Sequence, residues 1–199
     1  MENAYDLLLI SVDSPILLGI YEGQRLVQSY ERAGKFSDTL PQLFSEILRK
    51  VRKNTPAPNI YYANGPGNFS AIKLTHIFLQ TLSITQNIRL FCADAFHFSD
   101  SKFINAYGKV HFYKDSARDA VADSARDSMA DSAMDSMANS ARDSMADSAR
   151  DFMTDSAKCG AIRTTALDSK YPNSFTLPQR LDLHIFSEDC APLYVLPAV

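Results

Sequence analysis

The chain has 199 residues, of which 46% are hydrophobic, and its formal net charge at pH 7 is −3. This length is enough for a real core, and no apolar run approaches the roughly 20 residues that span a bilayer, so we expect no membrane association. The acidic start of the chain and its three cysteines without a CxxC pair favour a cytoplasmic protein with reduced thiols.

Three short strands joined by tight turns are predicted at the start of the chain. Apolar runs at 7–10 and 16–21 and an alternating stretch at 25–30 indicate them, with a turn at 22–24. A helix follows, because apolar residues recur at helical spacing and Ser37 or Asp38 can cap its start. Those apolar residues are Leu40, Leu43, Phe44, Ile47, Leu48 and Val51.

A Gly-Pro-Gly turn, Gly65-Pro66-Gly67, joins the next strand at 60–63 to a second helix at 72–82. Glycine lets two backbones approach closely, and Ser70 can cap the helix. Two uses of this turn are considered. Backbone N–H groups at the helix start can cradle a phosphate, or the turn is a structural corner. Without a loop lysine or metal ligands around it, the corner is favoured.

Shorter elements are predicted in the remainder of the chain. They are a strand at 90–93, a helix start at 95–98, strands within 103–113, and short strands at 161–167 and 183–186. The order of the first six elements, β-β-β-α-β-α, predicts an α/β fold, namely one lobe of an actin-like or sugar-kinase-like protein with a mixed sheet. We expect this lobe to be 1–99, with 100–114 plus 159–199 forming a shortened second lobe.

Residues 115–158 form an eight-residue tandem repeat in which Asp recurs every fourth residue from Asp115 to Asp155, except at Asn139. Ala, Met and Arg favour helix, but Asp residues four apart repel each other. A four-residue period also drifts around a helix of 3.6 residues per turn, so no continuous buried face results. We expect a solvent-exposed low-complexity insert; an interaction arm built on the Met residues is the alternative.

No catalytic centre is recognisable in the sequence. The four histidines lack metal-ligand spacing, and neither GxxxxGK[ST] nor GxGxxG occurs. Ser70 has no neighbouring base, and Asp13 and Asp94 are expected in loop or cap roles. We therefore expect no catalytic residue and no bound metal. The histidines are His76, His97, His111 and His184.

The segment GPGNFSAIK, Gly65 to Lys73, resembles the GPGSFTGLR signature of the TsaB family. These are bacterial tRNA threonylcarbamoyladenosine biosynthesis proteins, glycoprotease-like paralogues of TsaD. Further segments agree in order: 7–21 resembles the family's first hairpin, 35–41 its EHSERLLP-type helix start, and 192–194 its closing PxYLR-type segment. The resemblance covers 1–113 well and the C-terminal stretch thinly.

The chain departs from the family at two places. Ser11-Val12 follow the first strand where the family has Asp-Thr, a vestige of a nucleotide-phosphate loop. The second lobe is also shortened. Both departures argue against a chain that handles ATP alone.

The resemblance implies a non-catalytic scaffold that pairs with a TsaD homologue and activates threonylcarbamoyl transfer to N6 of adenosine 37 in tRNAs that read ANN codons. It implies no cofactor of the chain's own, ATP or ADP at the interface of the complex, a TsaE homologue as a further partner, and tRNA contact through the complex. A homodimer of the isolated chain stays open. The alternatives are a stand-alone actin-like ATPase or sugar kinase and, more weakly, a peptidase.

In this family the helix after the motif pairs with equivalent helices of a partner. The resemblance therefore assigns partner binding to Lys73, His76, Ile77 and Gln80. The helix itself agrees, because it is apolar beyond one stripe, with Phe78 and Leu79 beside Ile77. Burial of the excess inside the chain's own lobe is the alternative.

Overall fold

The computed structural model describes residues 5–52, 57–107, 109–114, 162–166 and 173–193. The predicted insert at 115–158 lies outside the described residues, as does Cys159. The elements below belong to one compact unit made of residues 1–113 and 164–199, apart from single ends of β7 and β8.

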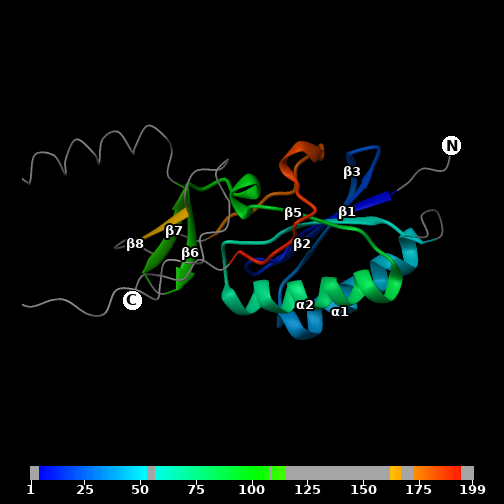
Figure 1. Cartoon of the computed structure of the whole chain (residues 1–199), viewed down its shortest axis with the longest axis horizontal. Helices are drawn as coiled ribbons and strands as arrows, with labels where there is room; N and C mark the ends of the chain where they lie inside the picture. Colours follow the sequence, from blue (N-terminus) through cyan, green and yellow to red (C-terminus); the bar gives the residue numbers. More distant parts are fainter. Residues whose placement is uncertain (1–4, 53–56, 108, 115–161, 167–172, 194–199) are drawn as a thin grey trace, which may run out of the picture. The chain divides into compact units, whose positions relative to one another are not determined.

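A five-stranded mixed sheet in the order β3-β2-β1-β4-β5 forms the centre of this unit (Figure 1). Its strands are β1 Tyr5–Ile10, β2 Ile16–Glu22, β3 Arg25–Arg32, β4 Asn59–Ala63 and β5 Leu90–Ala93. The first three strands pair antiparallel, and β4 pairs parallel with both β1 and β5. The predicted α/β class and mixed sheet are confirmed.

The β2–β3 hairpin closes through a two-residue turn, because Glu22 pairs with Arg25. Gly23 and Gln24 both have positive φ, 53° and 69°. Positive φ at both central residues defines a type I′ turn, whose twist matches that of the flanking strands. The predicted turn at 22–24 is thus confirmed.

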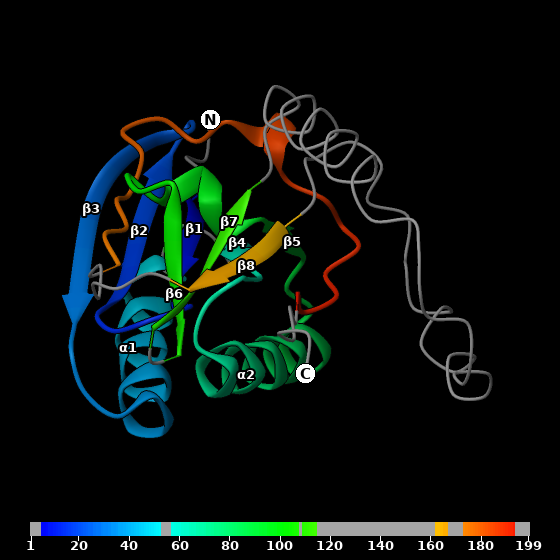
Figure 2. The same ribbon diagram turned by 90° about the vertical axis from the view of Figure 1, so that its left-hand side faces the viewer.

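Helices α1, Phe36–Val51, and α2, Phe69–Gln86, lie on the same face of the sheet (Figure 2). All six apolar residues that predicted α1 are buried. They pack against alternate residues of β1 and β4, because every second side chain of a strand points to the face that the helices cover. The core residues from the strands include Leu7, Leu9, Ile60 and Tyr62.

The predicted cap of α1 is wrong. The N-cap is Lys35, which makes no side-chain cap hydrogen bond, so Ser37 and Asp38 lie inside the first turn. Asp38 there still places a negative charge at the positive end of the helix dipole. The helix therefore begins earlier than the polar residues suggested.

The segment from Asn173 to Leu193, here called the C-terminal segment, crosses the sheet from one edge to the other. Near β3, Leu26 N donates to Gln179 O at 3.0 Å and Leu181 N to Gln24 O at 2.8 Å. At the opposite edge, Ser187 pairs with Cys92 of β5. On β4, Tyr61 lies between the core residues Ile60 and Tyr62 and therefore points to the opposite face of the sheet. There the centroid of its ring is 4.8 Å from that of Phe186. The segment therefore covers the sheet face opposite the helices.

The strand predicted at 183–186 is wrong. Residues Leu183–Ile185 form a 3-10 turn capped by Asp182, whose side chain accepts from His184 N at 3.0 Å. The helix start predicted at 95–98 is likewise one 3-10 turn, Ala95–Phe98.

A second, three-stranded sheet has the order β6-β7-β8. Its strands are Phe103–Tyr107, Val110–Lys114 and Ile162–Ala166, close to the positions predicted from the sequence. The division into lobes stays a prediction. Residues 173–193, which the sequence assigned to the second lobe, form their backbone hydrogen bonds mainly with residues of the first lobe.

Candidate protein-binding face on the second helix

The turn that precedes α2 is packed on both sides by distant parts of the chain. A Cβ atom on Gly67 would lie 2.5 Å from Val12 O, and one on Gly65 would lie 2.6 Å from Leu193 O. Asn68 N donates to Val12 O at 2.7 Å, and Leu193 N donates to Asn64 O at 2.9 Å. The glycines thus allow the backbone to touch the end of β1 and the C-terminal segment at once.

Asn68, and not Ser70, caps α2. Its side-chain oxygen accepts a hydrogen bond from Ala71 N at 3.1 Å. The helix consequently begins at Phe69 and extends to Gln86, seven residues longer than the predicted 72–82. The Asn68 and Ala71 N–H groups at this helix start are both hydrogen-bonded within the chain.

The structure places the four predicted partner residues on one side of α2. Lys73, His76, Ile77 and Gln80 are spaced i, i+3, i+4 and i+7, which aligns them along a helix. Lys73 and Ile77 are exposed, with 54% of Ile77 accessible, and the other two are half-buried.

His76 joins this side of the helix to the sheet beneath. Its Nδ1 lies 3.5 Å from the hydroxyl of Tyr62, which donates to Cys190 O at 3.2 Å. Burial lowers the pKa of His76, because the imidazolium loses part of its hydration there. This shift favours the neutral imidazole over the charged form.

Helix α2 is apolar on two opposite faces. Ala71, Ile72, Thr75, Leu79 and Leu82 are buried against the sheet and α1. Further apolar residues are exposed: Phe69, Leu74, Ile77 and Ile84. A helix with apolar residues on its solvent side commonly buries them against a second partner.

Phe78 and Leu79, the apolar residues beside Ile77, do not contribute to the exposed side of α2. Leu79 is fully buried, and Phe78 packs edge-on against Phe44 of α1, with ring centroids 5.2 Å apart. For these two residues the structure shows the alternative, packing inside the chain's own lobe. Leu74 and Ile84 are exposed instead, and Ile84 lies in the helix because α2 extends to Gln86.

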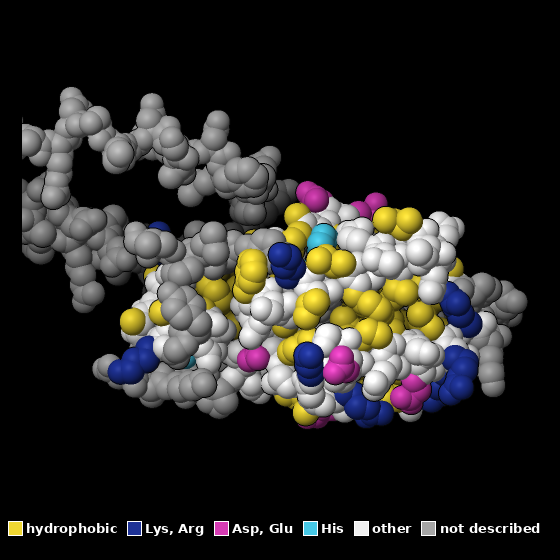
Figure 3. All heavy atoms as spheres, turned by 90° about the horizontal axis from the view of Figure 1, so that it is seen from below, with side chains coloured by type: hydrophobic (Ala, Val, Ile, Leu, Met, Phe, Trp, Pro, Cys, Tyr) yellow, Lys and Arg dark blue, Asp and Glu magenta, His cyan; other side chains and the backbone are white. Residues whose placement is uncertain are grey.

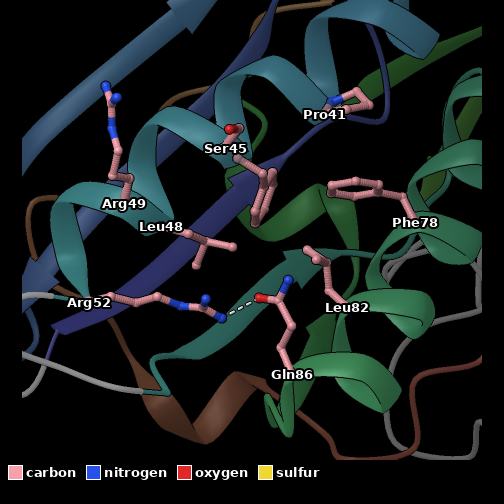
Figure 4. Close-up of a pocket in the computed structure, with 9 residues that line it drawn as sticks. Pro41, Ser45, Leu48, Arg49, Arg52, Phe78, Leu82 and Gln86 are labelled. Atoms are coloured by element: carbon pink, nitrogen blue, oxygen red, sulfur yellow. Dashed lines mark hydrogen bonds between the residues drawn. The ribbon is translucent and has the colours of Figure 1, made fainter.

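A groove runs between α1 and α2 beside this face (Figure 4). Its apolar lining includes Phe44, Leu48, Phe78 and Leu82. At one end Arg52 donates to the side chain of Gln86, and Arg49 is a further basic residue of the lining. Viewed from below, the surface shows hydrophobic side chains along its middle, with Lys, Arg, Asp and Glu side chains around them (Figure 3). The surface is therefore an apolar strip with a charged border.

The residues considered for nucleotide or metal chemistry have structural partners. Asp13 accepts from Ser14 N at 2.8 Å and from the side chain of Asn173, and Asp94 caps the turn at 95–98 by accepting from Phe96 N at 2.8 Å. The predicted loop and cap roles of the two carboxylates are confirmed. Among the described residues no group of three or more His, Cys, Asp or Glu side chains is placed to hold a metal. In the same residues, no helix is both long and apolar enough to cross a membrane.

Comparison with known proteins gives matches among solved structures. No protein-family model matches the chain, and no curated protein matches it. One similar structure is YeaZ from Pseudomonas aeruginosa, with 13% sequence identity and a TM-score of 0.44 over 56% of this chain and 58% of that chain. An uncharacterized protein with similarity to peptidase YEAZ from the same organism gives the same values. The chain thus spans little more than half the length of these relatives. YeaZ is the Pseudomonas name for TsaB, the family that Gly65 to Lys73 resembles.

Proposed function

We propose that this chain is a TsaB-type scaffold without a catalytic centre of its own. It pairs with a TsaD homologue and activates threonylcarbamoyl transfer to N6 of adenosine 37 in tRNAs that read ANN codons. The proposal combines the Gly65–Lys73 resemblance with the two-faced helix α2. In the proposed complex this chain is the accessory subunit.

The observation that carries the proposal is the exposed apolar side of α2. Burying apolar surface contributes about 25 cal/mol per Å², so three or four such side chains on one helix form a substantial docking surface. The groove beside them accepts side chains of a facing helix, since helices pack by placing ridges into grooves.

The partner residues have different tasks in this proposal. Ile77 inserts its side chain into the partner, while Lys73 and Gln80 form polar contacts at the rim. His76 stays tied to Tyr62 and orients the middle of the helix. The turn at Gly65, Pro66 and Gly67 sets the direction in which α2 leaves the sheet, because it is packed against Val12 and Leu193.

Further members of the complex follow from the same family resemblance. A TsaE homologue joins as an ATPase, ATP or ADP binds at the junction with TsaD, and tRNA contacts the complex as a whole. The chain itself contributes no cofactor, and the complex is cytoplasmic. In the absence of TsaD, the same α2 face pairs two copies of this chain.

The experiment is a co-purification of the full chain with TsaD from the same organism. Ile77→Asp places a charge in the proposed interface and is expected to abolish the association. Val27→Asp on β3 is the matched control, because Val27 is 52% exposed, close to the value for Ile77. The control should bind as the wild type does. Equal binding by both variants would remove α2 from the interface.

A stand-alone ATPase or sugar kinase is the second candidate, and Ser11-Val12 in place of Asp-Thr argues against it. Asp13, the nearby carboxylate, is already hydrogen-bonded to Ser14 and Asn173. Measuring ATP turnover by the isolated chain separates the candidates. Robust hydrolysis without TsaD would overturn the scaffold proposal.

The repeat at 115–158 is proposed to be dispensable. Deletion of residues 115–157 should leave association with TsaD near the wild-type level. A collapse of binding in this variant would make the repeat an interaction arm.

A further inference from the structure

Two thiols from distant parts of the chain meet at the outer edge of the five-stranded sheet. Cys92 lies in β5 and Cys190 in the C-terminal segment, and both are buried and reduced. Cys92 Sγ donates to Asp189 O at 3.2 Å, and Cys190 Sγ donates to Ser187 O at 3.5 Å. Both side chains belong to the same buried core cluster as Tyr62.

Backbone pairing holds the two cysteines in this arrangement. Cys92 N donates to Ser187 O at 2.8 Å, and Ser187 N donates to Cys92 O at 2.8 Å. Ser187 O therefore accepts from both the amide of Cys92 and the thiol of Cys190. This holds the loop that carries Cys190 beside Cys92 on β5.

The residues after this pair reach the turn that orients α2. Leu193 N donates to Asn64 O, and the Asn64 side chain donates to Ala191 O, each at 2.9 Å. The hydroxyl of Tyr62 donates to the carbonyl of Cys190 itself. A link between Cys190 and β5 would therefore also hold residues 191–193 against Asn64 and the turn that precedes α2.

We propose that Cys92 and Cys190 form a reversible disulfide that locks residues 187–193 onto β5, with a low-molecular-weight disulfide such as oxidised glutathione as the oxidant. This inference stands on the thiol pair alone and does not depend on the proposed partner or reaction.

The exchange is balanced as two successive thiolate attacks. The interaction with the Cys92 side chain lowers the pKa of Cys190, whereas the same interaction and burial raise the pKa of Cys92, so Cys190 is the first nucleophile. Its thiolate attacks the small disulfide, forms a mixed disulfide and releases one thiolate. Cys92, once deprotonated, then attacks Cys190 Sγ and releases the second. The two protein thiols are oxidised, one small disulfide is reduced to two thiols, and the two protons pass to those products.

The lock acts mainly on the open state of the C-terminal segment. A cross-link between residues 92 and 190 closes a long loop, and long loops lose the most entropy in the unfolded chain when they are closed. In the reduced protein Cys92 Sγ already reaches the carbonyl of Asp189, the residue before Cys190, so oxidation holds the existing arrangement. Reduction releases the segment to open from the sheet edge.

The test uses the full chain with a Cys159→Ser background, so that the third cysteine cannot exchange. Incubation with oxidised glutathione under native conditions is followed by non-reducing peptide mapping and mass spectrometry. We expect a 92–190 linked peptide, a melting temperature raised by about 5 °C or more, and full reversal by dithiothreitol. Amide exchange over 187–193 should slow in the oxidised protein.

Matched controls are Cys92→Ser and Cys190→Ser in the same background. Each should give no link and no shift in melting temperature with oxidant. The proposal is overturned if the folded parent forms no 92–190 link, or if a link appears only after denaturation. It is also overturned if the link forms without slowing exchange over 187–193.

Discussion

The hydroxyl oxygens of Ser11 and Thr75 lie 2.8 Å apart and form a buried hydrogen bond between the end of β1 and the first part of α2. Both residues are almost fully buried, so neither hydroxyl has water as a replacement partner. In an apolar surrounding, a hydroxyl that loses its partner keeps the full cost of its lost hydration. The pair therefore fixes α2 to the sheet through a polar contact inside the core.

Thr75→Val should destabilise the protein by about 1–3 kcal/mol, because it leaves the Ser11 hydroxyl buried without a partner. The double variant Ser11→Ala, Thr75→Val should lose less than the sum of the two single variants. Urea unfolding of the four proteins measures this coupling. Strict additivity would show that the two hydroxyls do not interact.

Gly67→Ala should lower the free energy of unfolding by about 1–3 kcal/mol, since the new methyl group collides with Val12. Gly23→Asn is the control. Position 23 has φ +53° with nothing within 4 Å of its Cβ, and asparagine tolerates that backbone conformation. The control should change stability by no more than about 0.5 kcal/mol. Chemical denaturation is the measurement, and equal effects would contradict the close approach at Gly67.

Two substitutions distinguish the inner and outer faces of α2. Leu79→Ala removes a fully buried side chain and should cost about 2–5 kcal/mol. Ile84→Ala removes a side chain that is 83% exposed and should change stability by less than about 0.5 kcal/mol in the isolated chain. Thermal and urea unfolding of the isolated chain provide both values. A large loss for Ile84→Ala would mean that this face is already buried.

His76 should make stability depend on pH. Because burial lowers its pKa in the folded state below the ordinary histidine value of 6.5, the unfolded chain takes up the proton first as pH falls. The free energy of unfolding should therefore decrease as pH drops below about 6.5, and level off once the folded state is also protonated. His76→Gln should reduce this dependence. Urea unfolding between pH 5 and pH 8 tests it, and identical profiles for both proteins would exclude the effect.

Local periodicity predicted most of the regular elements. The six apolar residues of α1, the strand at 90–93 and the turn at 22–24 are fixed by neighbours in the sequence, because burial on one face and the choice of turn act over a few residues. The helix starts were less predictable. The N-caps are Lys35 and Asn68 because the chain leaves the preceding turn at these residues. Several polar residues nearby fitted the sequence pattern of an N-cap equally well.

The sequence predicted only part of the candidate binding face on α2. Lys73, His76, Ile77 and Gln80 share a side by spacing alone, but which apolar residues remain exposed depends on α1. Phe78 is covered because Phe44 lies opposite it, and Ile84 stays open because no described element packs over it.

What the sequence by itself determined was the series of strands and helices, the Gly-Pro-Gly turn and the absence of familiar phosphate-loop motifs. Only the tertiary structure decided the path of the C-terminal segment, the Ser11–Thr75 contact and the meeting of Cys92 with Cys190. These contacts join residues 64 to 157 positions apart, for which neither helical nor strand periodicity carries information. They form because the sheet has two faces and two open edges, and burying those surfaces stabilises whichever distant segment fits them.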